Sequence, residues 1–447
     1  MATTTTGTGD NPFGGTYEFK GGTTSTSLDF ANMLKVLHGK LQATLNKESV
    51  TWDWFQELED VELRGSSLQW PVHTKRSGGV GAIAEGADLP TAGSTTKPRA
   101  VAVAKEIYGR VNLSLKVMEA SKNRDGSFAS AVADSMQDLE DELKQSLNRQ
   151  VIGHKVAGTD SAVSIGNFTG ILARLSADPA TGTTYNIDDG SAFQLYPGMP
   201  IRISTLISEL IPGGTATHTA TVSSITSATE FEATAAVAGI ADNDLISVGD
   251  TGFSSCKQEL IGLAHICDNA DELASIHPTD HASWKAFVSD NSGTTRNLSA
   301  ELLDAMFDAV YDQGGKRPDA IIAHSSLCRQ IKGLMENDVR YEPQKFRGGY
   351  ERKMLVWNNG EKDVPIIPDK HVPLNRAFFP HRASVGLGWM RKFGWVDTDG
   401  STFSRTDGTA NFDAVYGGML EVCCKQRNAH GRMDDIKVNT TTLGLPA

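Results

Sequence analysis

Four residues with metal-binding side chains lie close together in the sequence: His265, Cys267, His277 and His281. Imidazole and thiolate groups are the usual protein ligands of zinc, so this set is the first candidate for a metal site. Zinc sites normally show a tighter paired spacing, and Pro278 lies inside the second pair. The spacing therefore favours ordinary packed or surface histidines, and we assign no metal ligand.

Two aspartates at helical spacing, Asp308 and Asp312, could face one way as a general acid and a general base. Carboxylates placed like this are usually part of a solvated helix face. Gly314, Gly315 and Lys316 lack the earlier glycine and the following Ser or Thr of a phosphate-binding loop. The chain has neither a G-x-S-x-G nucleophile elbow nor an H-E-x-x-H metal motif. We therefore expect no catalytic residues, no cofactor and no enzyme activity.

A glycine-rich stretch, HTKRSGGVGAIAEGADLP at residues 73–90, is the third candidate. It could cradle a phosphate, but it has no Walker lysine, and its glycines do not follow the dinucleotide-binding spacing. The segments on either side, SLQWPVHTKR and TTKPRAVAVAKEIYGRVNLSLKV, alternate like extended strands. The stretch is therefore expected to form the tip of a long hairpin.

Composition limits the class of protein. The 447 residues carry a net charge of −12, with 39% hydrophobic and 21% charged residues, as is ordinary for a soluble globular protein. The negative charge opposes nonspecific binding to nucleic acid, which depends on Lys and Arg. Five scattered cysteines indicate reduced thiols. No stretch reaches the roughly 18 apolar residues of a membrane span, and the Thr-rich start is no secretory signal, so we expect a cytoplasmic protein without membrane contact.

Two amphipathic helices are predicted, one on each side of the hairpin. Residues 1–27 are Thr- and Gly-rich and should order only against a partner subunit. Apolar residues then recur at helical spacing from Leu28 to near Lys47. The strongest helical signal follows the hairpin, with apolar residues three or four apart at Phe128, Val132, Met136, Leu139, Leu143 and Leu147. About 25 helical residues would give a rod of roughly 37 Å.

Residues 176–250 differ in composition from their surroundings. Thr, Ser, Ala and Gly dominate, MPIRIS and TATHTATVSSI alternate as strands, and the one basic residue, Arg202, is set against nine acidic ones. This predicts a small β-rich inserted domain exposed to solvent. Beyond it, LSAELLDAMFDAVYDQGG and RPDAIIAHSSLCRQIKGLM indicate helix, strand and helix, and MLVWNNGEKDVPIIPD indicates a hairpin.

The order of these elements resembles that of the major capsid proteins of tailed bacteriophages, which have the Hong Kong 97 fold. The resemblance rests on AIAEGADLP near the hairpin tip, GRVNLSLKVMEAS before the long helix, GNFTGIL after it, RPDAIIAHSSLCRQI and VPIIPDKHVPLNRAFFP. It implies an α+β fold with an N-terminal arm (1–27), an N-terminal helix region (28–64), an extended hairpin loop (65–105), a peripheral domain with the long spine helix (106–150), an axial domain in two parts (151–175 and 251–405), the inserted β-rich domain (176–250), and a peripheral C-terminal strand and tail (406–447).

The resemblance also implies a function. A protein of this family assembles as hexamers and pentamers into an icosahedral shell that encloses double-stranded DNA without sequence-specific binding. Because the chain starts at Met1 with only a short arm, the scaffolding protein is expected to be a separate protein. The resemblance also implies a portal as a partner, and a decoration protein is left open. Localisation in the virion follows, with assembly in the host cytoplasm. The alternatives are an encapsulin-type cellular compartment, a β-rich surface adhesin, and an α/β hydrolase at residues 298–370.

Contact between subunits is predicted to join the hairpin to the spine helix of a neighbour. The positive hairpin is expected to dock on the acidic helix face, and the apolar tip is the alternative means of attachment. The candidate residues are Lys75, Arg76, Val80, Ile83, Leu89, Asp138, Asp141 and Glu142. Some relatives join subunits covalently through a hairpin lysine and a distant asparagine, but no local motif identifies that asparagine here.

Overall fold

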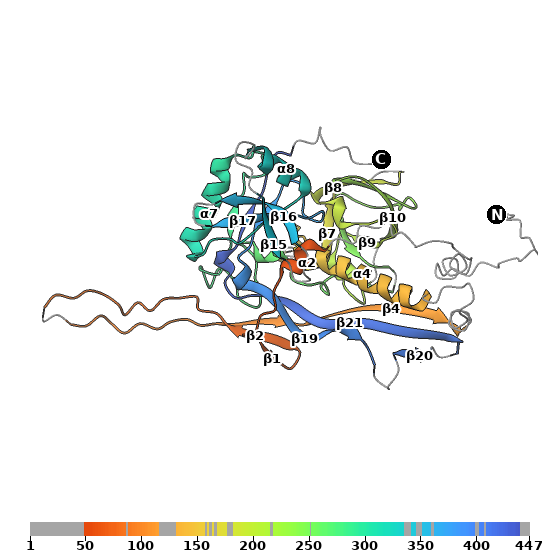
Figure 1. The fold of residues 1–447 in the computed structure, drawn as a ribbon, viewed down its shortest axis with the longest axis horizontal. Coiled ribbons are helices and arrows are strands. Elements are labelled where there is room, and N and C mark those ends of the chain that lie inside the picture. The colour runs from red at the N-terminus through yellow and green to blue at the C-terminus, as the bar shows by residue number, and fades with distance from the viewer. Residues whose placement is uncertain are drawn as a thin grey trace, which may run out of the picture.

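A computed structural model defines the fold. It describes residues 49–438 except for 86–87, 116–130, 157–158, 161–162, 165–167, 177–181, 215–217, 251, 335–340, 346–350, 359–361, 398–401 and 406–407. The predicted N-terminal arm and the helix predicted from Leu28 to Lys47 lie outside these residues. The rest combines a long sheet under a helix, a projecting hairpin, a second sheet flanked by helices, and a barrel (Figure 1). The fold is of the predicted α+β class.

The first unit is an antiparallel sheet covered by the spine helix α4 (Ala131–Ile152). Its strands are β4 (Lys105–Ser114), β19 (Val385–Trp395), β20 (Phe403–Arg405) and β21 (Asn411–Cys424). Strand β21 pairs with the other three. Gly109 of β4 lets the helix approach closely, because a Cβ there would lie 2.7 Å from Leu139 Cδ1. The helix ends at Gly153, whose φ of +63° lets its N–H donate to the Arg149 carbonyl.

The predicted apolar stripe of α4 is buried mainly along its second half. Leu143, Leu147 and Val151 are buried there, and this half contacts the short helix α2 (Val50–Trp54). Leu139, nearer the start, is only half-buried. The second half therefore anchors the helix in the subunit, and the first half keeps part of its side chains at the surface.

A three-stranded sheet carries the hairpin. Its strands are β1 (Glu62–Arg64), β2 (Ser67–Pro71) and β3 (Arg99–Val103). Leu68 and Trp70 on β2, and Ala100 and Ala102 on β3, are buried, so both strands alternate as half-buried strands do. Beyond Pro71 and Arg99 the two segments continue as the long arm in Figure 1. The predicted hairpin is present.

The second large sheet has seven strands. In spatial order they are β13 (Phe287–Ser289), β22 (Gly431–Met433), β18 (Ala377–Phe379), β14 (Ile321–Ala323), β17 (Asp363–Pro368), β16 (Glu351–Asn358) and β15 (Tyr341–Lys345). Helices α7 (Ala300–Gly314) and α8 (Ser325–Leu334) flank it. Ser299 caps α7 by accepting a hydrogen bond from Leu302 N–H, and Met306 and Phe307 pack into the core beneath the helix. The predicted helix, strand, helix and hairpin are all confirmed.

The predicted β-rich insertion is a closed six-stranded barrel. Its strands are β7 (Ile171–Leu175), β8 (Thr184–Gly190), β9 (Pro200–Ser204), β10 (His218–Ser227), β11 (Glu230–Ala233) and β12 (Leu245–Val248). The rings of Tyr185 and Phe231 stack in its core with centroids 5.3 Å apart. Ile171 of β7 pairs with Ser247 of β12, so the chain enters and leaves the barrel at adjacent positions.

The barrel begins before the change in composition at residue 176. Strand β7 was assigned from sequence to the axial domain, because ILARL is apolar and lacks the Thr and Ser character of the insertion. It lies between two cores: Leu172 and Leu175 face the barrel interior, and Ile171 packs with Val156 and Cys256 outside it. Strands covered on both sides read as continuous apolar runs, so composition alone does not reveal the boundary.

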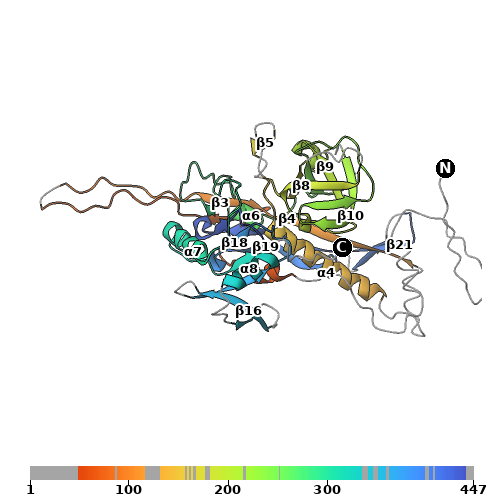
Figure 2. The same ribbon diagram turned by 90° about the horizontal axis from the view of Figure 1, so that it is seen from above.

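Figure 2 shows the barrel standing to one side of the layer formed by α4 and β21. Short elements complete the described chain: β5 (Thr159–Asp160), β6 (Val163–Ser164), α5 (Ile207–Leu210), α6 (Leu263–Ile266), and the 3-10 turns η2 (Ala192–Gln194), η3 (Arg382–Ser384) and η4 (Arg427–Ala429). Helix α5 contacts β9, and its Leu210 packs in a small apolar cluster with Leu245 of β12 and with Cys256. The barrel is thus a compact module with a small apolar base.

Candidate intersubunit surface

Polar contacts fasten the base of the hairpin to the loop at residues 273–284. Thr74 Oγ1 lies 3.0 Å from His281 Nδ1, and the Ser283 hydroxyl donates to the Thr74 carbonyl at 2.7 Å. On the returning strand, Val101 N–H donates to the Ala274 carbonyl at 2.9 Å. The base of the arm is therefore held on both strands.

Beyond this base the two sides of the arm stay together. Lys75 and Thr96 form an isolated antiparallel bridge. Farther out, the backbones meet at Gly79 and Gly93, where a Cβ on Gly79 would lie 2.6 Å from the Gly93 nitrogen. Only glycine fits at such a close backbone approach. These glycines thus have a structural role in the arm, and they form no phosphate loop.

The candidate contact residues of the hairpin are exposed. Lys75 and Arg76 lie at the surface, and Val80, Ile83 and Leu89 near the tip are 88%, 47% and 81% exposed. Large apolar side chains gathered on one projecting element are typical of an interaction surface. The arm therefore presents charge close to its base and apolar surface close to its tip.

The acidic candidates lie on the spine helix α4, away from the projecting end of the arm (Figure 1). Asp138 and Glu142 are exposed one helical turn apart. Asp141 is half-buried, accepts a hydrogen bond from Gln137 at 3.3 Å and lies 3.9 Å from Lys144 Nζ. The structure thus brings the hairpin candidates together on the arm and the acidic candidates together on α4. It does not join these two groups within one subunit.

An aromatic groove beside α4 was missed by the sequence analysis. It has a volume of about 300 Å³ and is lined by Trp52, Leu143, Leu147, Trp389, Phe393 and Tyr416, with Asp53, Glu57 and Glu140 among the polar lining residues. The rings of Trp389 and Phe393 meet edge to face at 5.4 Å. The lining comes from α2, α4, β19 and β21, so no local pattern predicts the groove. The spacing of the aromatic residues in GWMRKFGW was the one sequence feature that could have indicated it.

The candidate metal ligands do not form a metal site. His265 and Cys267 are buried at α6, whereas His277 and His281 lie in a half-exposed loop. Within the described residues no group of three or more His, Cys, Asp or Glu side chains could hold a metal ion. His281 instead contacts the base of the hairpin.

The remaining chemical candidates have ordinary surroundings. Asp308 and Asp312 are exposed on α7, and Asp308 Oδ1 lies 3.4 Å from Arg317 Nη2. All five cysteines are free thiols. Among the helices that the structure describes, none is long and apolar enough to cross a membrane.

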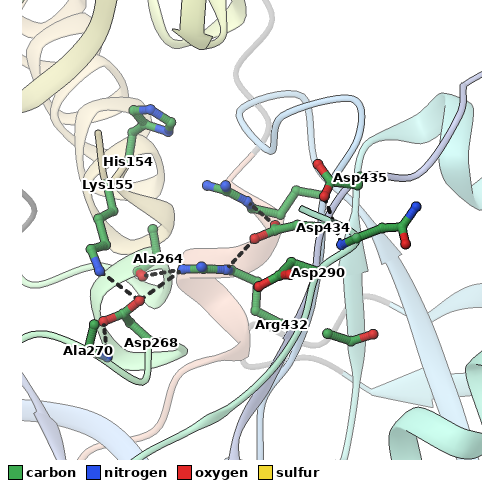
Figure 3. A network of polar contacts seen from close by, with 12 residues as sticks. His154, Lys155, Ala264, Asp268, Ala270, Asp290, Arg432, Asp434 and Asp435 are labelled. Carbon is green, nitrogen blue, oxygen red and sulfur yellow. Dashed lines mark hydrogen bonds and ion pairs between the residues drawn. The ribbon is translucent and has the colours of Figure 1, made fainter. Parts of the chain in front are cut away.

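A buried ion network ties distant parts of the chain together (Figure 3). Asp268, with a side chain only 3% exposed, lies 2.7 Å from Lys155 Nζ, 3.5 Å from Arg432 Nη1 and 3.6 Å from Arg427 Nη2. Burial alone would raise the pKa of Asp268, but Lys155 and Arg432 hold that pKa well below its usual range. Arg432 also binds Asp434 at 2.8 Å. The network joins the end of the spine helix to the loop after α6 and to β22.

Comparison with known proteins identifies the family. The family model described as the SU10 major capsid protein matches residues 23–437. No curated protein matches the chain in sequence. Similar solved structures include the cyanophage A-1(L) capsid asymmetric unit, with 12% identity, 89% of this chain and 95% of that chain covered, and a TM-score of 0.48.

Two further solved structures of low identity are also similar to the chain. The SrpI encapsulin of Synechococcus elongatus PCC 7942 is 8% identical, with 92% and 96% of the two chains covered and a TM-score of 0.42. A chain of Mycobacterium phage Bobi is 10% identical, with 91% and 97% covered and a TM-score of 0.41. The family match extends over almost the whole chain. The chain therefore belongs to the SU10 major capsid protein family, which confirms its resemblance to the major capsid proteins of tailed bacteriophages.

Proposed function

We propose that the chain assembles as hexamers and pentamers into a closed icosahedral shell of the Hong Kong 97 type. The projecting hairpin carries this proposal, because its tip leaves Val80 and Leu89 at 88% and 81% exposure. Burying a side chain of this kind contributes about 1.5–3 kcal/mol. The described part of one subunit does not bury them, and a neighbouring subunit in a closed symmetric assembly would.

We infer the following family layout for the observed elements. The hairpin would be the extended loop, and β4, α4 and β21 would form the peripheral domain. The seven-stranded sheet with α7 and α8 would form the axial domain. The barrel would stand on the outer surface of the shell, where its acidic side chains meet solvent. The family role is structural, and we propose no enzyme activity.

The shell would enclose double-stranded DNA without gripping it. A net charge of −12 disfavours extensive contact with phosphates, which suits an inner wall against packed DNA. A separate scaffolding protein and a portal are the proposed partners, and the mature particle is the proposed location after assembly in the host cytoplasm.

Electron microscopy of purified particles tests this function. We expect closed shells of uniform size that contain double-stranded DNA when taken from their native source. Shells that contain a protein cargo in place of nucleic acid would favour an encapsulin-type compartment. A protein that remains monomeric under all assembly conditions would overturn both readings.

Removing the barrel should leave assembly intact. A variant that lacks residues 171–248 and joins Gly170 to Gly249 by a short linker should still form shells, because closing such a gap costs little. A second variant that lacks residues 180–248 is the comparison, because it keeps β7 and leaves Leu172 and Leu175 of that strand uncovered. Electron microscopy and thermal melting distinguish the two. Folded subunits of the first variant that never assemble would count against placement on the outer surface.

Reversing the charge at the hairpin base should weaken the shell. We infer that Lys75 and Arg76 dock on the acidic face of α4 in an adjacent subunit. The double variant Lys75→Glu with Arg76→Glu should then form less stable shells, and the stability of these shells should depend less on salt. Each exposed pair contributes only about 0–1 kcal/mol, but the contact recurs at every subunit. Dissociation of shells across a salt series measures the effect.

A compensating change in the same chain provides the control for this pairing. Asp138→Lys with Glu142→Lys, added to the hairpin double variant, should restore stability, because the two surfaces again carry opposite charge. If the hairpin variant alone keeps the wild-type salt dependence and melting temperature, the charge pairing is wrong. The apolar residues Val80, Ile83 and Leu89 would then hold the arm.

A further inference from the structure

Four aromatic side chains form the wall of the groove beside α4. Trp52, Trp389, Phe393 and Tyr416 pack against the main core, but each stays only partly buried. The ring of Trp52 meets the rings of Trp389 and Phe393 edge to face, with 6.4 Å between centroids in both pairs. Large apolar side chains gathered around one opening indicate a surface that another segment covers.

The first described residues of the chain lie beside this groove. Ser49 directly precedes α2, and its Oγ lies 3.5 Å from Asp53 Oδ2. Asp53 and Trp52 of α2 both line the groove. We call residues 28–47, for which the sequence predicts a helix, the N-terminal segment. Residues 47–49 span at most roughly 11 Å, so the end of this segment must lie close to the groove of its own subunit.

The N-terminal segment has apolar side chains at the spacing that a groove of this kind accepts. Leu37, Leu41 and Leu45 follow one another four residues apart, on one face of the predicted helix. Gly39 lies inside the same helix and disfavours it in isolation. A helix with these two features is stable only when its apolar face packs against another element.

The rim of the groove is acidic. Its lining contains the carboxylates of Asp53, Glu57 and Glu140 and the ammonium group of Lys144. Lys392 pairs with Glu57 at 3.1 Å from outside the lining. Negative groups still outnumber positive ones, so the groove favours an occupant that carries positive charge.

Charge distinguishes the N-terminal segment from the other apolar element that could fill the groove, the hairpin tip of a neighbour. The N-terminal segment carries three lysines and one aspartate. Residues 77–96 of the hairpin carry Glu85 and Asp88 and contain no lysine or arginine. Like charges placed against each other across an interface disfavour binding, and opposite charges favour it. The acidic rim therefore selects the N-terminal segment over the tip.

We propose that residues 28–47 form an amphipathic helix that folds back on α2 and fills the aromatic groove of its own subunit with Leu37, Leu41 and Leu45. This contact lies within one subunit, so it is independent of the proposed shell and needs no neighbour. The groove is then a part of the subunit core that the N-terminal segment completes.

Hydrogen exchange of dilute, unassembled full-length subunits tests this contact. The amides of residues 33–46 should be protected, because a packed helix opens far less often than a free peptide of the same sequence. Leu37→Asp with Leu41→Asp should make these amides exchange roughly 100-fold faster, because two leucines no longer fill the groove. Exchange at the free-peptide rate in the wild-type subunit would overturn the proposal.

A matched variant controls for the added charge. Gln42→Asp with Asn46→Asp places two aspartates at the same spacing, but on the polar face of the predicted helix. It should change the exchange of residues 33–46 far less than the leucine variant does. Equal acceleration by the two double variants would overturn the assignment of the leucine face to the groove.

Changes in the groove show what the N-terminal segment packs against. Phe393→Ser removes one ring of the wall, and Glu140→Lys makes the rim positive on the surface of α4. Each should accelerate exchange of residues 33–46, although both positions are far from that segment in the sequence. Unchanged exchange in either variant, once folded, would overturn the proposal, and Glu140→Lys keeps the test decisive if Phe393→Ser fails to fold.

Combining the two sides tests for direct contact. Leu37→Asp and Leu41→Asp break the same packing as Phe393→Ser, so the melting temperature of the triple variant should fall by less than the sum of the separate losses. Additive losses would overturn the contact. Protection of residues 33–46 that appears only on assembly would also overturn it and would place the segment on a neighbour. Because the subunits are unassembled, failure here leaves the proposed shell function untouched.

Discussion

The Asp268→Asn subunit is expected to be about 3–5 kcal/mol less stable than the native one, which is the usual cost of removing one partner from a buried charge network. Asp268 faces Lys155, Arg427 and Arg432, and Arg427 is fully buried. An asparagine can still accept from the Ala270 and Asp271 amides, but it leaves the three cations without their shared carboxylate. Urea unfolding of unassembled subunits measures the loss.

The pH dependence of this loss has a definite sign. The pKa of Asp268 is lowered in the folded protein, so the charged form stabilises the fold at every pH above about 4, the ordinary value. The difference between wild type and variant should be constant from pH 8 to pH 5 and should shrink as pH falls below 4. Asp60→Asn, which removes an exposed partner of Lys425, is the control and should change nothing measurable.

If Asp268→Asn lowers the free energy of unfolding by less than about 1 kcal/mol, Asp268 is not the carboxylate that holds this network together. The network connects residues 155, 268 and 432, which belong to segments far apart in the chain. Sequence periodicity could not reveal it, because each charged residue taken alone resembles a surface residue. Only the fold shows that one carboxylate serves three cations.

Local patterns did predict most of the elements. The spine helix, α7, the strand-helix unit at β14 and α8, and the β16–β17 hairpin all follow from side-chain periodicity and turn residues. Periodicity works here because each element buries one face of its own. It failed at β7, where ILARL is covered from two directions and carries no sign of the barrel that it closes.

Contacts between distant segments were the part that sequence could not supply. The aromatic groove takes Trp52, Trp389 and Tyr416 from three segments, and the stacked rings of Phe193 and His324 come from two. In each case the residue types are common ones, and their role becomes apparent only from the distant residues that they contact. The hairpin is the exception, because its alternating flanks and glycine tip are local, and its function depends on the surface that it leaves exposed.

Shortening the hairpin should abolish shells while it leaves the subunit folded. A variant that joins Thr74 to Thr96 through an Asn-Gly turn keeps the base contacts of Thr74 with His281 and Ser283. It also keeps the buried residues Leu68 and Trp70 of the small sheet. Circular dichroism should therefore show a native melt, and electron microscopy should show no closed particles.

We expect the apolar residues at the hairpin tip to contribute more to shell assembly than the charged residues at its base. Val80 and Leu89 would each contribute about 1.5–3 kcal/mol if a neighbour buried them, and Ile83, which is 47% exposed, would contribute less. Each exposed ion pair contributes about 0–1 kcal/mol. The full-length control Val80→Ser with Leu89→Ser should therefore impair assembly more than reversal of Lys75 and Arg76. If the shortened variant forms shells of normal size, the arm is dispensable, and subunits must be held by other surfaces. Equal impairment by the serine and charge variants would instead show that tip and base act as one contact.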